Sequence, residues 1–272
     1  MKLTDNILDL IGNTPLLQLK KISEGNVYAK AEFLNPGGSI KDRVARYIIE
    51  RAECDGILKP ESVIIEATSG NTGIGVTLAG RIKGYRVIIV MPEDMSEERK
   101  KIIAALGGRL VLTPKEKGIA GAVQEADRLI AETPEAFRVG QFENPRNPEV
   151  HYRETAPEIW EAMDGRIDAF VAGVGSGGTL GGVGKFLKER NPRVRIVAVE
   201  PANSSALLGH EPGFHVIQGI GDGFIPPALD TSLIDEVVTV SDDEAIKTTR
   251  RLASEECILA GTSSGANVWA SL

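Results

Sequence analysis

The chain has 272 residues, of which 42% are hydrophobic and 25% are charged, a composition typical of a globular protein with one large domain or two modest ones. Its formal net charge of -7 argues against binding to nucleic acid or to an anionic membrane through a basic surface, and leaves small molecules and proteins as the expected partners. The two cysteines, Cys54 and Cys257, are too few for a disulfide framework and lack the spacing of a zinc site.

The first fifteen residues, MKLTDNILDLIGNTP, contain no basic segment followed by an apolar core. Nowhere does an apolar run approach the ~20 residues that span a bilayer. Together with the low cysteine content, this predicts a cytoplasmic protein with no membrane association and no bound metal.

Runs rich in β-branched residues alternate with longer segments of helical periodicity. Short, mostly buried strands are predicted at 27–33, 62–68, 86–92, 109–113, 168–173, 195–200 and 236–240. Helices are predicted at 40–55, 71–83, 96–106, 118–132, 179–190 and 241–256, and Gly56, Gly84 and Gly107 stand where C-terminal caps are expected. This alternation predicts an α/β fold with parallel sheets and helices on both faces. The irregular segment 133–150 is the candidate crossing between two lobes.

Two predicted strands run directly into a glycine-rich turn and then a helix. These are IIEATSGNTGIG at 64–75 and VAGVGSGGTLGG at 171–182, and both place backbone N–H groups and a helix dipole where an anion could bind. In the second, Gly173, Gly175 and Gly178 satisfy G-x-G-x-x-G, and Glu200 ends the next strand. An NAD-dependent dehydrogenase is therefore one reading of this loop, and a purely structural tight turn is another.

NPGGSIKDR at 35–43 places Lys41 at the expected start of a helix. Gly37 and Gly38 allow a ligand to approach the backbone, and Ser39 can cap the helix. The positive end of the helix dipole disfavours the charged ammonium, so we expect a lowered pKa for Lys41 and a neutral fraction that can attack a carbonyl. The alternative is an ordinary lysine that solvates a helix end.

Six motifs carry a resemblance to a known family. They are NPGGSIKDR, TSGNTG (68–73), QFENPRNPEVHYRETAPEIW (141–160), GVGSGGT (173–179), QGIGDGFIP (218–226) and GTSSGA (261–266). In order and spacing they resemble the cysteine synthase family, the O-acetylserine sulfhydrylases of the tryptophan-synthase-β-like pyridoxal phosphate enzymes (fold type II), over essentially the whole chain. The resemblance implies two lobes, each a mostly parallel twisted sheet, with the cofactor in the cleft between them. We expect a smaller lobe at 40–145 and a larger one formed by 1–39 and 146–272.

The resemblance also implies roles for individual residues toward pyridoxal 5'-phosphate. Lys41 is similar to the lysine that holds the cofactor as a Schiff base and later takes the substrate Cα proton. Ser263 is similar to the hydroxyl that hydrogen-bonds the pyridine nitrogen. The cofactor phosphate is expected at Gly175, Ser176, Gly177, Gly178 and Thr179, where amides, hydroxyls and a helix N-terminus suit a dianion without a cationic side chain.

The substrate groups implied by the resemblance surround the first glycine loop. The α-carboxylate is expected at Thr68, Ser69, Gly70, Asn71 and Thr72, with assistance from Gln141 and Gly219. Asn71 is also expected beside the ring oxygen of the cofactor. The alternative for Ser69, Asn71 and Ser263 is ordinary helix capping.

No catalytic or ligand-binding role is predicted for the histidines or the tryptophans. His151, His210 and His215 lack any metal-ligand spacing, so we interpret them as structural or exposed. Trp160 and Trp269 are interpreted as packing residues.

The activity implied by the resemblance is that of a transferase that makes L-cysteine from O-acetyl-L-serine and sulfide by β-elimination and replacement. One alternative is a cystathionine β-synthase-type or other β-replacement enzyme that uses serine or another nucleophile. Another is a weakly active homologue that serves as a partner of serine acetyltransferase. The resemblance further implies a homodimer that can bind the C-terminal tail of serine acetyltransferase.

Four features depart from the family pattern. Ser176 stands where threonine is common, and Glu154-Thr155-Ala156 replaces the usual Thr-Thr-Gly. Asp222 stands where relatives often carry a small residue at the active-site entrance. Family members also continue beyond the position of Leu272, which suggests a chain truncated at its C-terminus.

Overall fold

The structure is a computed structural model that describes residues 3–68 and 70–272. The chain forms two compact units. Unit 1 comprises the segment that ends at Gly12 together with Glu32–Arg146, and unit 2 comprises Asn13–Ala31 and Asn147–Leu272. The lobe limits implied by the resemblance differ from these units at residues 3–12, 32–39 and 146, and they stay a prediction.

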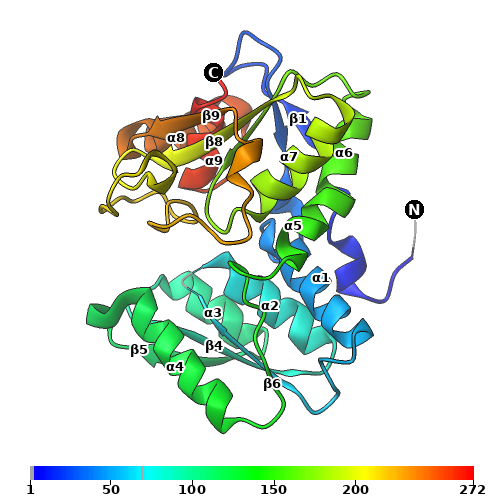
Figure 1. The fold of residues 1–272 in the computed structure, drawn as a ribbon, viewed down its shortest axis with the longest axis vertical. Helices are drawn as coiled ribbons and strands as arrows, with labels where there is room; N and C mark the ends of the chain where they lie inside the picture. The colour runs from blue at the N-terminus through cyan, green and yellow to red at the C-terminus, as the bar shows by residue number, and fades with distance from the viewer. Residues whose placement is uncertain (1–2, 69) are drawn as a thin grey trace. The chain divides into compact units, whose positions relative to one another are not determined.

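Unit 1 is built on a four-stranded parallel sheet with the order β5-β4-β3-β6. The strands are β3 (Val63–Ala67), β4 (Arg86–Pro92), β5 (Arg109–Thr113) and β6 (Ala136–Phe137). The helices are α1 (Lys41–Cys54), α2 (Asn71–Ile82), α3 (Glu97–Ala105) and α4 (Gly118–Glu132). In Figure 1, α4 covers one face of this sheet, while α2 and α3 cover the other.

Alternation along β3 explains why this sheet is covered on both faces. Val63 and Ile65 are buried in one cluster with Ala122 of α4, whereas Ile64, between them, lies beside Gly80 of α2. Successive side chains of a strand point to opposite faces, so an apolar run without polar alternation requires helices on both sides. The predicted α/β class with helix-flanked parallel sheets is confirmed.

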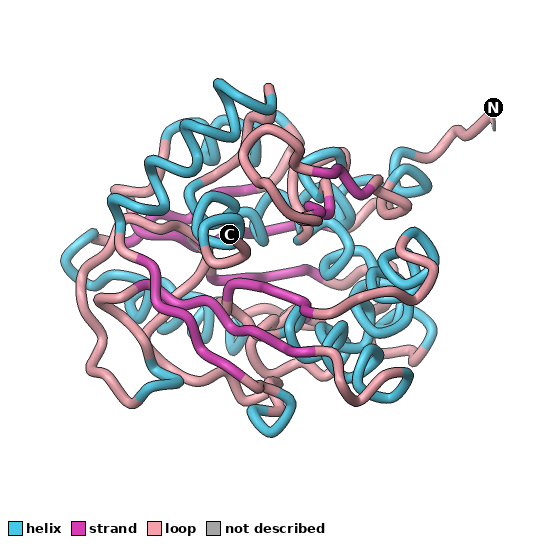
Figure 2. Tube along the Cα trace, turned by 90° about the horizontal axis from the view of Figure 1, so that it is seen from above, coloured by secondary structure: helices cyan, strands magenta, loops and turns pink. Residues whose placement is uncertain are grey.

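Unit 2 contains a three-stranded parallel sheet with the order β7-β8-β9 and a small antiparallel pair, β1-β2. The strands are β1 (Leu16–Gln18), β2 (Tyr28–Lys30), β7 (Ala169–Gly173), β8 (Arg195–Pro201) and β9 (Glu236–Val240). The helices are α5 (Arg146–Val150), a π-helical segment (His151–Thr155), α6 (Ala156–Ala162), α7 (Gly178–Arg190), α8 (Asp242–Glu256) and α9 (Thr262–Trp269). Figure 2 draws the strands in magenta and the helices in cyan.

The two faces of the unit 2 sheet bury different helices. Ile196 and Ala198 of β8 pack with α6 and α7, where Trp160 also packs. Val199 packs instead with α8 and α9, next to Trp269. Both tryptophans therefore contribute to packing, as predicted.

Helix ends in both units follow the capping rules. Gly56, Gly84 and Gly107 all have positive φ and follow α1, α2 and α3 as predicted, because glycine adopts the left-handed conformation without a Cβ penalty. At α8, the Ser241 and Glu244 side chains form a capping box. Cys54 and Cys257, near the ends of α1 and α8, are exposed free thiols.

Two expectations about chain segments were wrong. The strand predicted at 27–33 is the shorter β2, and it pairs antiparallel with β1 instead of joining a parallel sheet. The segment 133–150 is not irregular throughout, since it contains β6 and α5. Both errors arise because elements of two to five residues carry too little periodicity to fix their type, limits or pairing.

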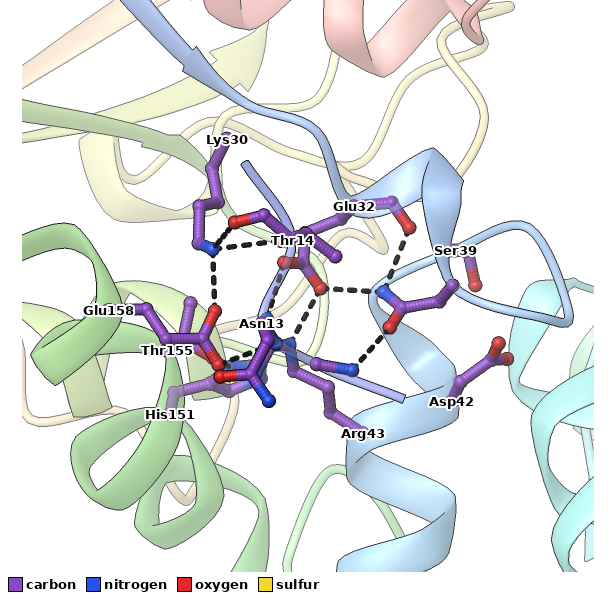
Figure 3. A network of polar contacts seen from close by, with 12 residues as sticks. Asn13, Thr14, Lys30, Glu32, Ser39, Asp42, Arg43, His151, Thr155 and Glu158 are labelled. Atoms are coloured by element: carbon purple, nitrogen blue, oxygen red, sulfur yellow. Dashed lines mark hydrogen bonds and ion pairs between the residues drawn. The ribbon is translucent and has the colours of Figure 1, made fainter. Parts of the chain in front are cut away.

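Buried ion pairs hold the segments that lead into these elements (Figure 3). In unit 1, the fully buried Arg43 donates from Nε and Nη2 to the two carboxylate oxygens of Glu32, at 2.8 Å each. Asn35 donates to the same carboxylate and accepts from the Gly12 N–H. A buried bidentate pair tolerates little displacement, so it fixes the loop that precedes Lys41.

None of the described helices is both long and apolar enough to cross a membrane.

Candidate functional site

Lys41 is the first residue of α1, as predicted. Its N–H donates to Oγ of Ser39 at 3.2 Å, although the capping position itself is Ile40. The start of α2 lies close by, because a Cβ atom at Gly75 would be 2.9 Å from the Lys41 carbonyl oxygen. Gly75 is about one helical turn after Asn71. Within unit 1, the structure therefore brings the proposed cofactor lysine beside the helix that follows the first glycine loop.

The residue after Lys41 ties the NPGG turn to the helix. Asp42 is fully buried and accepts from the Gly37 N–H at 2.5 Å. Burial raises the pKa of this carboxyl to about 6, against the lowering effect of the Gly37 hydrogen bond. Glycine suits position 37, since a Cβ atom there would force the buried Asp42 carboxylate to move. The turn and the first helical residues thus form one packed unit.

The first glycine loop leaves β3 at Ala67 and enters α2 at Asn71. Thr68 is buried and its hydroxyl accepts from the Gly70 N–H at 3.2 Å. Thr72 donates from its buried hydroxyl to Oε1 of Gln141 at 2.8 Å. Ser69 lies outside the described residues. The structure thus brings Thr72 and Gln141 together, at the N-terminus of a helix that can bind an anion.

Glu66 supports the same loop from the strand that precedes it. Its Oε2 accepts from the N–H groups of Val139 and Gly140, at 3.1 Å each. Complete burial raises the pKa of this carboxyl to about 7, although these hydrogen bonds and Arg138 act in the opposite direction. Glu66 was not predicted from the sequence. The available signal was a lone acidic residue in the apolar run SVIIEA.

The second glycine loop leaves β7 at Gly173 and enters α7 at Gly178. Gly177 adopts a left-handed conformation with φ of 76° and no side chain caps the helix. A Cβ atom at Gly175 would collide with the Gly219 carbonyl, and one at Gly178 would collide with the Asn147 side chain. The backbone of this loop is therefore packed so closely that only glycine fits at these positions.

Two hydroxyls of this loop have partners that the sequence did not predict. Ser176 is buried and its Oγ accepts from Nδ2 of Asn147 at 2.9 Å. His151 is 1% exposed and contacts Thr179 Oγ1 through Nε2 at 3.4 Å. Its Nδ1 contacts Thr155 Oγ1 at 3.0 Å. His151 is thus structural, as interpreted, and it orients a residue of the loop.

Ser263 and Gly219 lie beside the second glycine loop in unit 2. Gly219 has φ of 94°, and a Cβ atom there would lie 3.9 Å from Ser263 Oγ. Because Gly219 also contacts Gly175, these three positions form one cluster. The capping alternative fails for Ser263, since α9 begins after Gly261 without a side-chain cap. It fails for Asn71 in the same way, because the cap of α2 is Gly70.

Glu200 decides against the dinucleotide reading of this loop. The residue is 2% exposed, and its Oε2 accepts from the Ser205 hydroxyl at 2.6 Å and from the Leu207 N–H at 3.1 Å. A ribose-binding carboxylate has to present its oxygens to the ligand. Glu200 instead accepts hydrogen bonds from the loop that follows it.

The second glycine loop fits the phosphate of pyridoxal phosphate. It offers the first N–H groups of α7, which have no partner within the helix, together with the Ser176 and Thr179 hydroxyls, and it carries no charged side chain from 173 to 182. A dianion needs such donors. Within residues 3–68 and 70–272, no cluster of three or more His, Cys, Asp or Glu side chains is placed to hold a metal ion.

Comparison with known proteins identifies the family. The sequence model of the pyridoxal-phosphate dependent enzyme family matches residues 7–272. The chain belongs to the pyridoxal-phosphate dependent enzymes. Cysteine synthase of Staphylococcus aureus (strain Mu50 / ATCC 700699) is 49% identical over 275 aligned residues, which cover 100% of this chain and 88% of that protein.

Two solved structures of relatives have nearly the same fold. Cysteine synthase from Entamoeba histolytica matches with a TM-score of 0.95 and 43% identity, over 98% of this chain and 81% of that one. The O-acetylserine dependent cystathionine beta-synthase from Helicobacter pylori matches with a TM-score of 0.93 and 41% identity, over 100% of this chain and 90% of that one. The family resemblance inferred from the sequence is confirmed.

Proposed function

We propose that this chain is a cysteine synthase, a pyridoxal phosphate-dependent transferase that makes L-cysteine from O-acetyl-L-serine and sulfide. The observation that carries the proposal is a pairing within unit 1. The backbone of Lys41, at the start of α1, packs against Gly75 of α2, the helix whose N-terminus can bind a carboxylate. Similarity to cysteine synthases over the full chain supports the same activity.

The contacts to the cofactor are assigned from the family resemblance. Lys41 would hold the cofactor covalently through Nζ, and Ser263 would hydrogen-bond the pyridine nitrogen. The phosphate would be held by Gly175, Ser176, Gly177, Gly178 and Thr179. When bound, pyridoxal phosphate supplies an electron sink that acidifies the substrate Cα–H bond and allows acetate to leave from Cβ.

The remaining chemistry belongs to side chains and amides of this chain. The N–H groups at the start of α2, with Thr68, Asn71 and Thr72, would bind the substrate carboxylate and orient the Cα–H bond. Gln141 would hold Thr72 in place through the 2.8 Å hydrogen bond. Nζ of Lys41, once released from the cofactor, would accept the Cα proton, since a neutral lysine is both nucleophile and base. Ser69, Gly70 and Gly219 would complete the substrate contacts.

A second candidate is a β-replacement enzyme with another nucleophile. The relative from Helicobacter pylori is described as an O-acetylserine dependent cystathionine beta-synthase, and it is nearly as similar to this chain as the Entamoeba enzyme. The two activities share all of the roles above and differ only in the nucleophile that attacks Cβ. Product analysis with O-acetylserine plus either sulfide or homocysteine distinguishes them.

The resemblance also supports partners for this enzyme. We propose a homodimer that works in the cytoplasm and that can bind the acidic C-terminal tail of a serine acetyltransferase. The carboxylate at the end of such a tail would occupy the same amides of α2 as the substrate carboxylate.

The deciding experiment measures the visible spectrum and turnover of the wild-type protein and of Lys41→Ala. The wild type should carry a yellow chromophore and make cysteine. The variant should lose that absorbance band and at least about 1000-fold in turnover, because it lacks both the covalent attachment and the base. Lys59→Ala, which removes an exposed lysine of unit 1, is the control. An unchanged spectrum in Lys41→Ala would show that Lys41 does not hold the cofactor.

A further inference from the structure

Glu66 is a buried acid for which the proposed function has no use. It lies on β3, with 3% of its surface exposed, two residues before Thr68. A carboxylate buried without partners would be strongly destabilising, so its hydrogen bonds indicate what it does. They all lead to one turn, at residues 139–141, which follows β6.

This turn carries Gln141. Gly140, at its centre, has φ of 62°, and the Asn144 side chain donates to the Val139 carbonyl at 2.9 Å. The carboxylate of Glu66 therefore binds the two backbone N–H groups immediately before Gln141, the residue whose side chain accepts from Thr72. β3 is thus linked to the start of α2 in two steps. The Glu66 carboxylate binds the turn, and the Gln141 side chain of that turn binds Thr72.

We propose that Glu66 is a positioning residue, whose ionised carboxylate holds the turn 139–141 so that Gln141 fixes Thr72 for binding of the substrate carboxylate. The proposal rests on the proposed function, because it takes the N-terminus of α2 as the carboxylate site. Hydrogen bonds to an ionised acceptor are roughly twice as strong as neutral ones. Protonation of Glu66 therefore loosens the turn without removing any atom from it.

Apart from Asp42 of α1, whose pKa is raised to about 6, few groups of unit 1 could titrate in place of Glu66. Arg138 acts on it electrostatically and is itself paired with Asp127 of α4. The residue paired with Glu66 on β4 is the apolar Ile89. The charged residue of α2 is Arg81, which donates to the Tyr85 carbonyl. The raised pKa of Glu66, about 7, places its ionisation in the working range of an enzyme.

Hydrogen–deuterium exchange of the pyridoxal phosphate-loaded protein tests the first link. Glu66→Gln should accelerate exchange in the peptide that covers 138–144, whereas Glu61→Gln, at an exposed position five residues earlier, should not. This measurement requires no turnover, so it remains decisive even if the proposed activity is wrong. Equal exchange in Glu66→Gln and in the wild type would overturn the proposal.

A double-mutant cycle tests whether Glu66 acts through Gln141. Glu66→Gln should raise KM for O-acetylserine about tenfold, the loss expected for one charged hydrogen bond, with little change in kcat. Added to Gln141→Ala, it should cause no further loss, because the side chain that it positions is absent. If the fold-changes in KM caused by the two substitutions multiplied in the double variant, Glu66 would have a merely structural role and the proposal would be overturned.

The pH profile supplies a readout that a packing defect would not change. For the wild type, KM for O-acetylserine should rise as pH falls through about 7, since the neutral carboxyl holds the turn less strongly. In Glu66→Gln, this step should disappear and KM should stay high throughout. The same step in both proteins would assign the titration to another group and contradict the proposal.

Discussion

The two glycine loops have the same order of strand, turn and helix, but they are held in different ways. The loop at 173–179 depends on its backbone, since a Cβ atom at Gly175 or Gly178 would collide with neighbouring atoms. The loop at 68–72 depends on side chains, since a Cβ atom at Gly70 would meet nothing within 4 Å. One loop is specified by the absence of side chains and the other by Thr68, Thr72 and their partners.

This difference matches the ligands that we assign to the two loops. A permanently bound phosphate needs fixed N–H donors, and close packing supplies them at no cost when the ligand arrives. A substrate that binds and leaves in each cycle is better served by a loop whose contacts can adjust. Adding a methyl group to a glycine of either loop, or removing a side-chain contact of the first loop, tests this difference.

The largest expected effect is that of Gly178→Ala. The added methyl group would collide with the buried Asn147 side chain, so we expect loss of bound cofactor and a free energy of unfolding lower by about 1–3 kcal/mol. Gly70→Ala is the matched control and should retain cofactor with nearly wild-type stability. Absorbance of the purified proteins and urea unfolding measure both quantities. Equal behaviour of the two variants would remove the distinction between the loops.

The next effect concerns stability as a function of pH. Because the pKa of Glu66 in the folded chain is raised from 4.5 to about 7, the folded state keeps a proton that the unfolded state releases. The stability that this group contributes is complete below about pH 4.5 and is lost as pH rises through about 7. Relative to Glu66→Gln, the wild type should lose about 3 kcal/mol over that interval. Urea unfolding at several pH values measures the loss, and parallel curves would contradict it.

A smaller effect is expected from removing one hydroxyl of the first loop. Thr72→Val should raise KM for O-acetylserine and lower the free energy of unfolding by about 1–3 kcal/mol, because Gln141 loses a buried donor. Thr77→Val, in the same helix, removes a buried hydroxyl that donates to the Gly73 carbonyl. It should lower stability similarly and leave KM unchanged. An equal rise in KM for both variants would mean that helix stability alone governs substrate binding.

The smallest effect belongs to Asp222, an exposed residue near the Gly175 backbone. If an acidic serine acetyltransferase tail binds as proposed, Asp222→Ala should tighten binding because it removes a negative charge that repels the tail. The gain should be several-fold at most, since exposed charge pairs are worth about 0.2–1 kcal/mol. The gain should shrink as salt rises. Titration of a tail peptide at low and high salt measures this. Equal affinities at low salt would leave Asp222 as a turn residue beside Gly221 and Gly223.

Much of the fold was predictable because its signals are local. The central strands and the helices from α1 to α4, α7 and α8 lie within a few residues of their predicted limits. The segment from α5 to α6 was not predicted as helical, and Pro148 favoured an irregular structure there. Pro157 lies at the start of α6, directly after the π-helical segment His151–Thr155, so it stands inside a continuous helical stretch, where proline is unusual because it lacks an N–H.

The motifs of the site were recognisable in the sequence, but the residues that support them were not. Glu66 and Val139 are 73 positions apart, and Thr72 and Gln141 are 69 apart. Asn147 reaches Ser176 across 29 positions. No periodicity connects such pairs, because the sheet order that brings them together is set by the packing of the whole unit.

The two free thiols make the protein convenient for labelling. Cys54 belongs to unit 1 and Cys257 to unit 2, and both are exposed. Since the sequence has two cysteines in total, a maleimide donor–acceptor dye pair would place one fluorophore on each unit without any mutation. Energy transfer between the dyes, recorded while O-acetylserine is added and consumed, would report any change in the separation of the two units during turnover.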